Sequence, residues 1–372
     1  MKIPPVKVYF PEEDREDILE KISETLNTGY LTLGKYTEEF EKMFAEYIGT
    51  EYAVAVNSGT AALEIILRSI GIKGRSVIVP TNTFFATPAS VIHAGGKVVF
   101  SEISGNLCMS PMHLLDNINN DTKAVILVHI GGNITSEINE IQEICEDHEL
   151  YLIEDAAHAH GATIDGMKAG NLGDAGAFSF YPTKVMTTGE GGMITTNDKR
   201  IYEKALILRD QGKARYNNNI HVELGYAWRM NEINAILGLS QLRHLDEFLN
   251  DRRRIANFYD RRLRSFNCLD SIQISRSVKS SYYKYVVLLE SGIDRDSIKK
   301  ELKDEYNVSL TGEVYEVPCH KQPIANKING FKNNVFPVAE DLCKRHICLP
   351  IFATMTIEEA QYVIDSLKEV VR

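Results

Sequence analysis

An apolar run that ends in two acids reads Tyr151-Leu152-Ile153-Glu154-Asp155-Ala156-Ala157-His158. Its apolar residues predict a buried β-strand, and Asp155 then falls at the carboxyl end of that strand. Ligands of open α/β sheets bind outside this end of the strands. Because a buried carboxylate needs a cation or hydrogen-bond donors, Asp155 either faces a protonated group such as a pyridine nitrogen or caps the next turn.

Strand-like and helix-like runs alternate on both sides of this stretch. We expect strands at residues 52–57, 76–80, 97–103, 124–130, 151–155, 177–181 and 192–196. We expect helices at residues 12–27, 36–48, 60–70, 84–94 and 135–148. Apolar strands interleaved with helices predict an α/β fold in which a large, mostly parallel sheet is covered on both faces.

The rest of the chain has fewer strands and longer helices. The pattern predicts helices at residues 229–247, 249–265, 294–306 and 357–370, and one clear strand at 282–289. We therefore expect a large domain over residues 1–248 and a smaller C-terminal α+β domain over residues 249–372.

Composition restricts the partners of the protein. The 372 residues are 44% hydrophobic and 25% charged, with a formal net charge of −10, as in ordinary globular proteins. No basic cluster indicates nucleic acid, and no apolar run reaches the roughly 18 residues that a membrane span needs. The chain starts without a signal-peptide pattern, and its six cysteines show no paired or zinc-like spacing. We expect a cytoplasmic protein with reduced thiols and no metal site.

A lysine follows another predicted strand, in Phe178-Ser179-Phe180-Tyr181-Pro182-Thr183-Lys184. A glycine-rich turn at residues 189–192 keeps the space around Lys184 open, and Ser179 can donate to a phosphate. A lysine amine in a low-dielectric pocket loses its proton readily and attacks carbonyl groups. The plain alternative is a solvated surface lysine.

Two more strand ends carry unusual residues. The first reads Asn57-Ser58-Gly59-Thr60-Ala61-Ala62-Leu63, where free N–H groups at a helix start can hold a phosphate, unless Ser58 or Thr60 simply caps the helix. The second reads Pro80-Thr81-Asn82-Thr83-Phe84-Phe85-Ala86-Thr87, where an aromatic ring can stack on a planar cofactor or belong to the core. A phosphate seat, a stacking ring, a carboxylate and an amine are together what pyridoxal 5'-phosphate (PLP) requires.

These stretches resemble the DegT/DnrJ/EryC1/StrS family of sugar aminotransferases, which have the fold-type I architecture of PLP-transferases. The resemblance runs from about residue 29 to residue 245. It implies that Lys184 holds PLP as a Schiff base and shuttles protons, and that Asp155 pairs with the pyridinium nitrogen. It implies further cofactor contacts by His158 at the phenolic oxygen, by Gly59, Thr60 and Ser179 at the phosphate, and by Phe84 on the ring.

The resemblance also implies a homodimer with the active site at the interface and substrate contacts by Tyr181, Tyr226, Arg229 and His320. The chain departs from the family in one place. It reads Gly225-Tyr226-Ala227-Trp228-Arg229-Met230, where the family usually has Gly-Tyr-Asn-Tyr-Arg-Met. Ala227 lacks the amide that often contacts the neighbour's cofactor phosphate. Arg229 or a water must compensate, or the phosphate is held less tightly, and the acceptor need not be a typical nucleotide sugar.

The expected activity is transfer of an amino group, by resemblance from glutamate, onto a keto sugar, nucleotide-linked, in the biosynthesis of cell-surface polysaccharide or a related product. A small phosphorylated ketone such as a triose phosphate is the alternative acceptor. A PLP-dependent sugar dehydratase of the same family would have His in place of Lys184. A nicotinamide-dependent enzyme would show a GxGxxG motif after a strand, which this sequence lacks.

Overall fold

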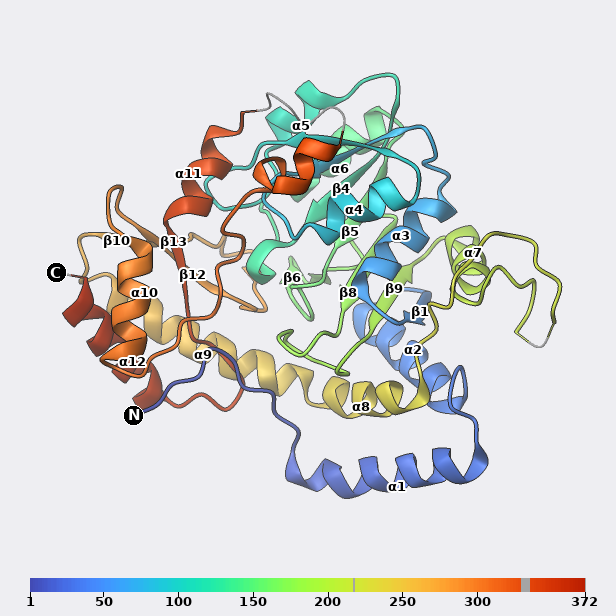
Figure 1. The fold of residues 1–372 in the computed structure, drawn as a ribbon, viewed down its shortest axis with the longest axis horizontal. Helices are drawn as coiled ribbons and strands as arrows, with labels where there is room; N and C mark the ends of the chain where they lie inside the picture. The colour runs from blue at the N-terminus through green and yellow to red at the C-terminus, as the bar shows by residue number, and fades with distance from the viewer. Residues whose placement is uncertain (217, 329–334, 372) are drawn as a thin grey trace.

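A seven-stranded sheet forms the centre of the larger lobe (Figure 1). The computed structural model describes residues 1–216, 218–328 and 335–371. The strand order is β1-β9-β8-β5-β4-β2-β3, and neighbours are parallel except where β9 meets β1 and β8. The mainly parallel sheet is thereby confirmed. Its strands are β1 (Tyr52–Val56), β2 (Ser76–Pro80), β3 (Lys97–Ser101), β4 (Thr122–Val128), β5 (Tyr151–Asp155), β8 (Ala175–Ser179) and β9 (Gly192–Thr196).

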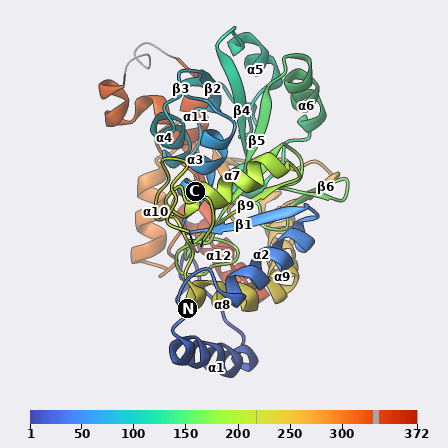
Figure 2. The same cartoon turned by 90° about the vertical axis from the view of Figure 1, so that its right-hand side faces the viewer.

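Helices cover both faces of this sheet (Figure 2). Successive residues of a strand point to opposite faces, and in β4 Val125 and Leu127 belong to one hydrophobic core while Ala124 and Ile126 belong to another. The helices of this lobe are α1 (Glu12–Thr28), α2 (Lys35–Ile48), α3 (Gly59–Ser69), α4 (Ala86–His93), α5 (Pro111–Asn117), α6 (Ile138–Asp147), α7 (Lys199–Arg209) and α8 (Glu232–Arg243).

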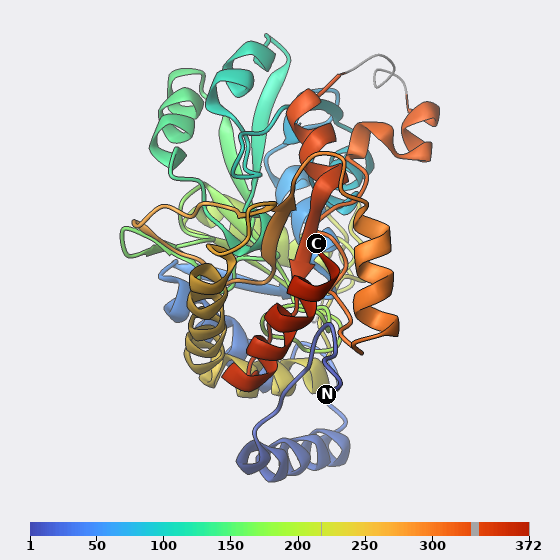
Figure 3. The same cartoon turned by 90° about the vertical axis from the view of Figure 1, so that its left-hand side faces the viewer.

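The smaller lobe is built on an antiparallel sheet of order β10-β12-β13 (Figure 3). Its core contains Tyr259, Val287 and Leu367, and Ile3 from the start of the chain packs into it. A short sheet of order β11-β6-β7 links the two lobes, because β11 of the smaller lobe pairs with β6 of the larger lobe. The elements are α9 (Leu245–Leu263), β10 (Leu269–Ser271), β11 (Val278–Lys279), β12 (Tyr285–Leu289), α10 (Arg295–Asp304), α11 (Pro337–Arg345), β13 (His346–Leu349) and α12 (Ile357–Val370), with β6 (Thr163–Ile164) and β7 (Met167–Lys168) contributed by the larger lobe.

Several observed elements differ from the expected ones, and short elements such as α5, α11 and β13 were not expected. Helices α8 and α9 meet at His244 rather than near residue 248. Helix α7 was not expected, although the Asp198 carboxylate caps it by accepting the N–H of Arg200 over 2.7 Å. Helix α4 begins after Phe85 rather than at residue 84, which leaves Phe84 outside the helix. In the described ranges, no helix is both long and apolar enough to cross a membrane.

Candidate active site

The carboxyl end of β5 carries a buried, oriented carboxylate. Asp155 is 7% exposed, and its two oxygens accept hydrogen bonds from the Thr87 hydroxyl over 2.8 Å and from the Ala157 N–H over 3.2 Å. Burial raises the pKa of Asp155, and the bonds from Thr87 and Ala157 and the charge of Lys184 act against that rise. A protonated ring nitrogen beside this carboxylate would supply the cation that its burial calls for.

Lys184 lies on the loop after β8, held by a turn in which its N–H donates to the Tyr181 carbonyl over 2.9 Å. Its Nζ atom is 4.8 Å from the centre of the Tyr283 ring. Burial lowers the pKa of Lys184 to about 8, with a further lowering by the charge of Lys284 and an opposing effect of Asp155. A larger fraction of this amine is therefore neutral near pH 7 than of a solvated lysine, and the neutral amine is the nucleophile.

His158 follows Asp155 and faces the same space. Its ring stacks on Tyr283, with ring centres 4.2 Å apart. Burial lowers the pKa of His158 well below its usual value, so the ring is neutral. The Gly131 N–H donates to Nδ1 over 3.3 Å, which assigns the remaining ring proton to Nε2, 3.3 Å from the Tyr315 hydroxyl.

The start of α3 packs directly against the ends of β8 and β9. A Cβ on Gly59 would come within 2.8 Å of the Ser179 Cβ, and one on Gly192 would come within 2.4 Å of the Ser58 carbonyl carbon. The Ser58 hydroxyl caps the helix by accepting the Ala61 N–H over 3.1 Å. The first N–H groups of α3, including those of Gly59 and Thr60, precede the intrahelical ladder and are available to an anion next to Ser179.

The smaller lobe contacts the site at two places. Phe84 is 64% exposed rather than part of the core, and its ring lies 6.3 Å from that of Tyr315. The smaller lobe reaches the site through two glycines after β4. Gly131 and Gly132 have positive φ, and a Cβ on Gly132 would lie 2.0 Å from the Ser281 Oγ. Only glycine leaves room for the chain to approach this closely.

The predicted substrate residues lie in different surroundings. Tyr181 and Tyr226 are each 49% exposed, and Tyr226 stacks on Trp228. Arg229 forms an ion pair with Asp210 over 2.6 Å.

His320 is buried. Its ring nitrogens contact the Thr81 hydroxyl at 2.6 Å and the Glu340 carboxylate at 3.0 Å. A substrate contact by His320 would replace one of these bonds. The structure thus brings Lys184 and His158 to the Tyr283 ring, with Asp155 near enough to Lys184 for the two charges to interact. It places Arg229 and His320 in other contacts.

Sequence reasoning missed four residues that the structure adds to the site, namely Thr87, Tyr283, Lys284 and Tyr315. Thr87 lies within a stretch that was singled out for its aromatic residues. The other three come from the smaller lobe, roughly 100 residues or more after Lys184 in the chain. The pair Gly131-Gly132 directly after a strand was the available signal that another part of the chain approaches there.

The residues present fit PLP: anion-binding N–H groups beside a tightly packed glycine, a buried carboxylate, and a half-buried amine with a lowered pKa. A seven-stranded, mainly parallel sheet with such groups at its strand ends defines a fold-type I PLP-dependent aminotransferase. The chain belongs to the DegT/DnrJ/EryC1/StrS aminotransferase family, whose model matches residues 12–368.

Individual relatives cover nearly the whole chain. The spore coat polysaccharide biosynthesis protein SpsC of Bacillus subtilis is 36% identical over 95% of this chain and 94% of its own length. The UDP-4-amino-4,6-dideoxy-N-acetyl-beta-L-altrosamine transaminase of Campylobacter jejuni is 32% identical over 95% and 94%. The structure of NtdA from Bacillus subtilis with bound cofactor PMP matches with a TM-score of 0.91 and 27% identity, over 100% of this chain and 85% of that one.

Proposed function

We propose that this enzyme transfers an amino group from glutamate to the keto group of a nucleotide-linked sugar in the biosynthesis of a cell-surface polysaccharide or a related product. The names of the two curated relatives, a spore coat polysaccharide protein and a UDP-sugar transaminase, support this substrate class. The observation that carries the chemistry is the half-buried amine of Lys184, whose charge interacts with the buried carboxylate of Asp155.

In the proposed mechanism, bound PLP supplies an electron sink for the carbanion that forms at the amino-bearing carbon. Asp155, oriented by Thr87 and Ala157, holds a proton at the ring nitrogen. The Lys184 amine would hold PLP and would move a proton to and from the amino-bearing carbon of the substrate. Its lowered pKa suits this exchange near neutral pH.

The remaining site residues would bind the cofactor and shield it from water. Gly59, Thr60 and Ser179 would hold the phosphate of PLP, and Phe84 would stack on its ring. His158 holds its Nε2 proton toward the smaller lobe. Tyr315, from that lobe, closes the space between His158 and Phe84 and helps to exclude water.

We also propose that the enzyme works as a homodimer. Exposed apolar side chains gather in one segment of the larger lobe, including Ile220 (61% exposed), Val222 (54%) and Leu224 (88%). An exposed apolar patch of this kind marks an interaction surface, and we propose that a second copy of the chain binds to it. Light scattering is expected to give a dimer, and Leu224→Asp is expected to weaken it. A monomeric wild-type protein would contradict the proposal.

The division into domains at residues 248 and 249 and a cytoplasmic location stay proposals as well. All six cysteines are free thiols, five of them buried, which supports a reducing compartment.

A two-stage titration tests the activity. PLP-loaded protein is first mixed with L-glutamate, and its visible absorption band is followed until the cofactor carries the amino group. After the donor is removed, the protein is offered either a GDP- or UDP-linked keto sugar or a triose phosphate. We expect the nucleotide-linked sugar to restore the original band. Restoration by the triose phosphate alone would show that the acceptor class is wrong.

Lys184→Ala is expected to show neither absorbance change. Lys199→Ala is the matched control. The side chain of Lys199 is 71% exposed at the start of α7. A Lys184→Ala protein that completes both stages at the wild-type rate would overturn the proposed role of Lys184.

A further inference from the structure

Lys284 is a partly buried cation whose one hydrogen bond in the described chain goes to a neutral group. Its Nζ atom donates to the Gly312 carbonyl over 3.0 Å. The neighbouring carboxylate of Glu313 is bound by Lys299 at 2.6 Å, with Arg295 at 3.8 Å. Among the ion pairs formed by the described residues, none includes Lys284. Burial lowers the pKa of Lys284, and the charge of Glu313 only partly opposes that lowering.

This ammonium and the reacting amine both lie near the Tyr283 ring. The Nζ atoms of Lys184 and Lys284 are 4.8 and 5.2 Å from the centre of the same Tyr283 ring. The Lys284 N–H donates to the Gly131 carbonyl over 3.1 Å, and the Gly131 N–H donates in turn to His158. The backbone of Lys284 is therefore joined through Gly131 to His158, and the charge of Lys284 contributes to the lowered pKa of Lys184.

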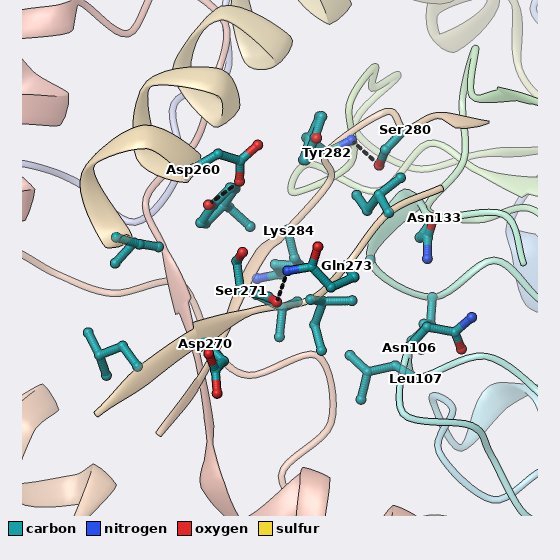
Figure 4. A pocket seen from close by; sticks show the side chains of 18 of the residues that line it. Asn106, Leu107, Asn133, Asp260, Asp270, Ser271, Gln273, Ser280, Tyr282 and Lys284 are labelled. Atoms are coloured by element: carbon teal, nitrogen blue, oxygen red, sulfur yellow. Dashed lines mark hydrogen bonds between the residues drawn. The ribbon is translucent and has the colours of Figure 1, made fainter. Parts of the chain in front are cut away.

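A cavity of about 420 Å³ opens next to Lys284 between the two lobes (Figure 4). Its volume falls within the range of small-molecule sites, about 300–1,000 Å³. Polar side chains line it from both lobes, and one of them, Asp260, already accepts a hydrogen bond from the Tyr285 hydroxyl over 2.6 Å. Lys284 and Gly131 line this cavity, whereas Lys184 and Asp155 do not, so the cavity adjoins the reaction site on the side of Lys284. Among the described residues, Lys284 has no ion-pair partner.

We propose that Lys284 is an anion subsite that binds an acidic group of the substrate while the reacting end of that substrate lies at Lys184. The shared chemistry is a carboxylate or a phosphate. A distal carboxylate would come from a dicarboxylic amino donor, and a phosphate would come from the acceptor. The inference rests on the proposed aminotransferase function and assigns one substrate contact within it.

Two variants separate charge from shape. Lys284→Met keeps the apolar stem and removes the charge, and Lys284→Arg keeps a charge. Lys279→Met, an exposed lysine of the same lobe, is the matched control. Thermal unfolding and the visible band of the PLP-loaded protein show whether each variant folds and takes up the cofactor.

Three measurements are made on the loaded proteins: the L-glutamate concentration for half-maximal reaction, the same quantity for the keto acceptor, and the binding of succinate by calorimetry. Lys284→Met is expected to raise one of the two substrate concentrations at least about tenfold, since a hydrogen bond to a charged group is lost. Lys284→Arg is expected to bring that substrate concentration most of the way back to the wild-type value. A change in the glutamate arm, with loss of succinate binding, identifies the donor carboxylate, and a change in the acceptor arm identifies the phosphate.

Unchanged values in both arms, with unchanged succinate binding, would overturn the subsite. If the wild-type protein transferred no amino group in either arm, the proposed function would fail instead. The binding of succinate and of inorganic phosphate to wild type and to Lys284→Met would then still decide the role of Lys284.

Discussion

The hydroxyl of Thr87 donates a hydrogen bond to the carboxylate of Asp155 over 2.8 Å. Thr87 lies in the first turn of α4, after β2, and Asp155 lies at the end of β5, so this bond joins two strand ends of the sheet. Together with the bond from Ala157, it fixes the direction of the carboxylate before any ligand binds.

Replacing Asp155 by Asn keeps the shape of the side chain and removes its charge. We expect the cofactor still to bind and the glutamate half-reaction to slow by about a hundredfold or more, because the charge that holds the ring nitrogen protonated is gone. Thr87→Val loses one hydrogen bond to a charged group, worth about 1.5–3 kcal/mol. Its rate in the glutamate half-reaction should lie between those of wild type and Asp155→Asn. Stopped-flow absorbance measures both rates. Wild-type rates in Asp155→Asn would remove this carboxylate from the mechanism.

Loading of PLP into the cofactor-free protein should depend on pH around 8. The pKa of Lys184 is lowered to about 8 by burial, so the amine is protonated below that pH and neutral above it. Only the neutral amine attacks the aldehyde, and the loading rate should therefore rise as pH increases through 8. Mixing experiments from pH 6 to pH 10 measure the midpoint. A midpoint near the usual lysine value of about 10.4 would show that the amine is solvated.

Gly59→Ala should damage the phosphate seat. The added methyl group would lie 2.8 Å from the Ser179 Cβ and 3.2 Å from the Phe178 carbonyl oxygen, so α3 must move away from β8. Overpacking of this kind costs about 1–3 kcal/mol, and we expect both the melting temperature and the affinity for PLP to fall. Gly105→Ala is the control, because nothing lies within 4 Å of its Cβ position. Equal PLP affinities for the two variants would argue against the seat.

Tyr283 should act through its ring more than through its hydroxyl. The ring stacks on His158 and lies beside the Lys184 amine, while the hydroxyl contacts Thr183 at 3.1 Å. Aromatic and cation–π contacts are worth about 0.5–2 kcal/mol, so Tyr283→Leu should lower kcat/KM by up to about thirtyfold. Tyr283→Phe should keep most of the activity. If Phe were as damaging as Leu, the hydroxyl would be the important group.

Local sequence was enough to predict the sheet and the residues at its strand ends. The strand that ends at Asp155, the helix start at Gly59 and the loop that carries Lys184 are each defined by residues within a few positions of one another. The structure confirms the strand and helix at those places. The roles of these side chains toward PLP stay predictions.

The part of the site that comes from the smaller lobe could not be predicted in this way. The stretch Tyr282-Tyr283-Lys284-Tyr285 reads only as the start of a strand, and nothing within it indicates that two of its side chains approach Lys184. That approach depends on the docking of the lobe against Gly131 and Gly132, which is a contact between segments roughly 150 residues apart.

The most direct test of the account is to find which lysine carries the cofactor. PLP-loaded protein is reduced with borohydride, which makes the cofactor–lysine bond permanent, and its peptides are then mapped by mass spectrometry. We predict that the pyridoxyl group is found on Lys184 and is missing from the Lys184→Ala protein. Its presence on Lys284 or any other lysine in the wild-type protein would contradict the account.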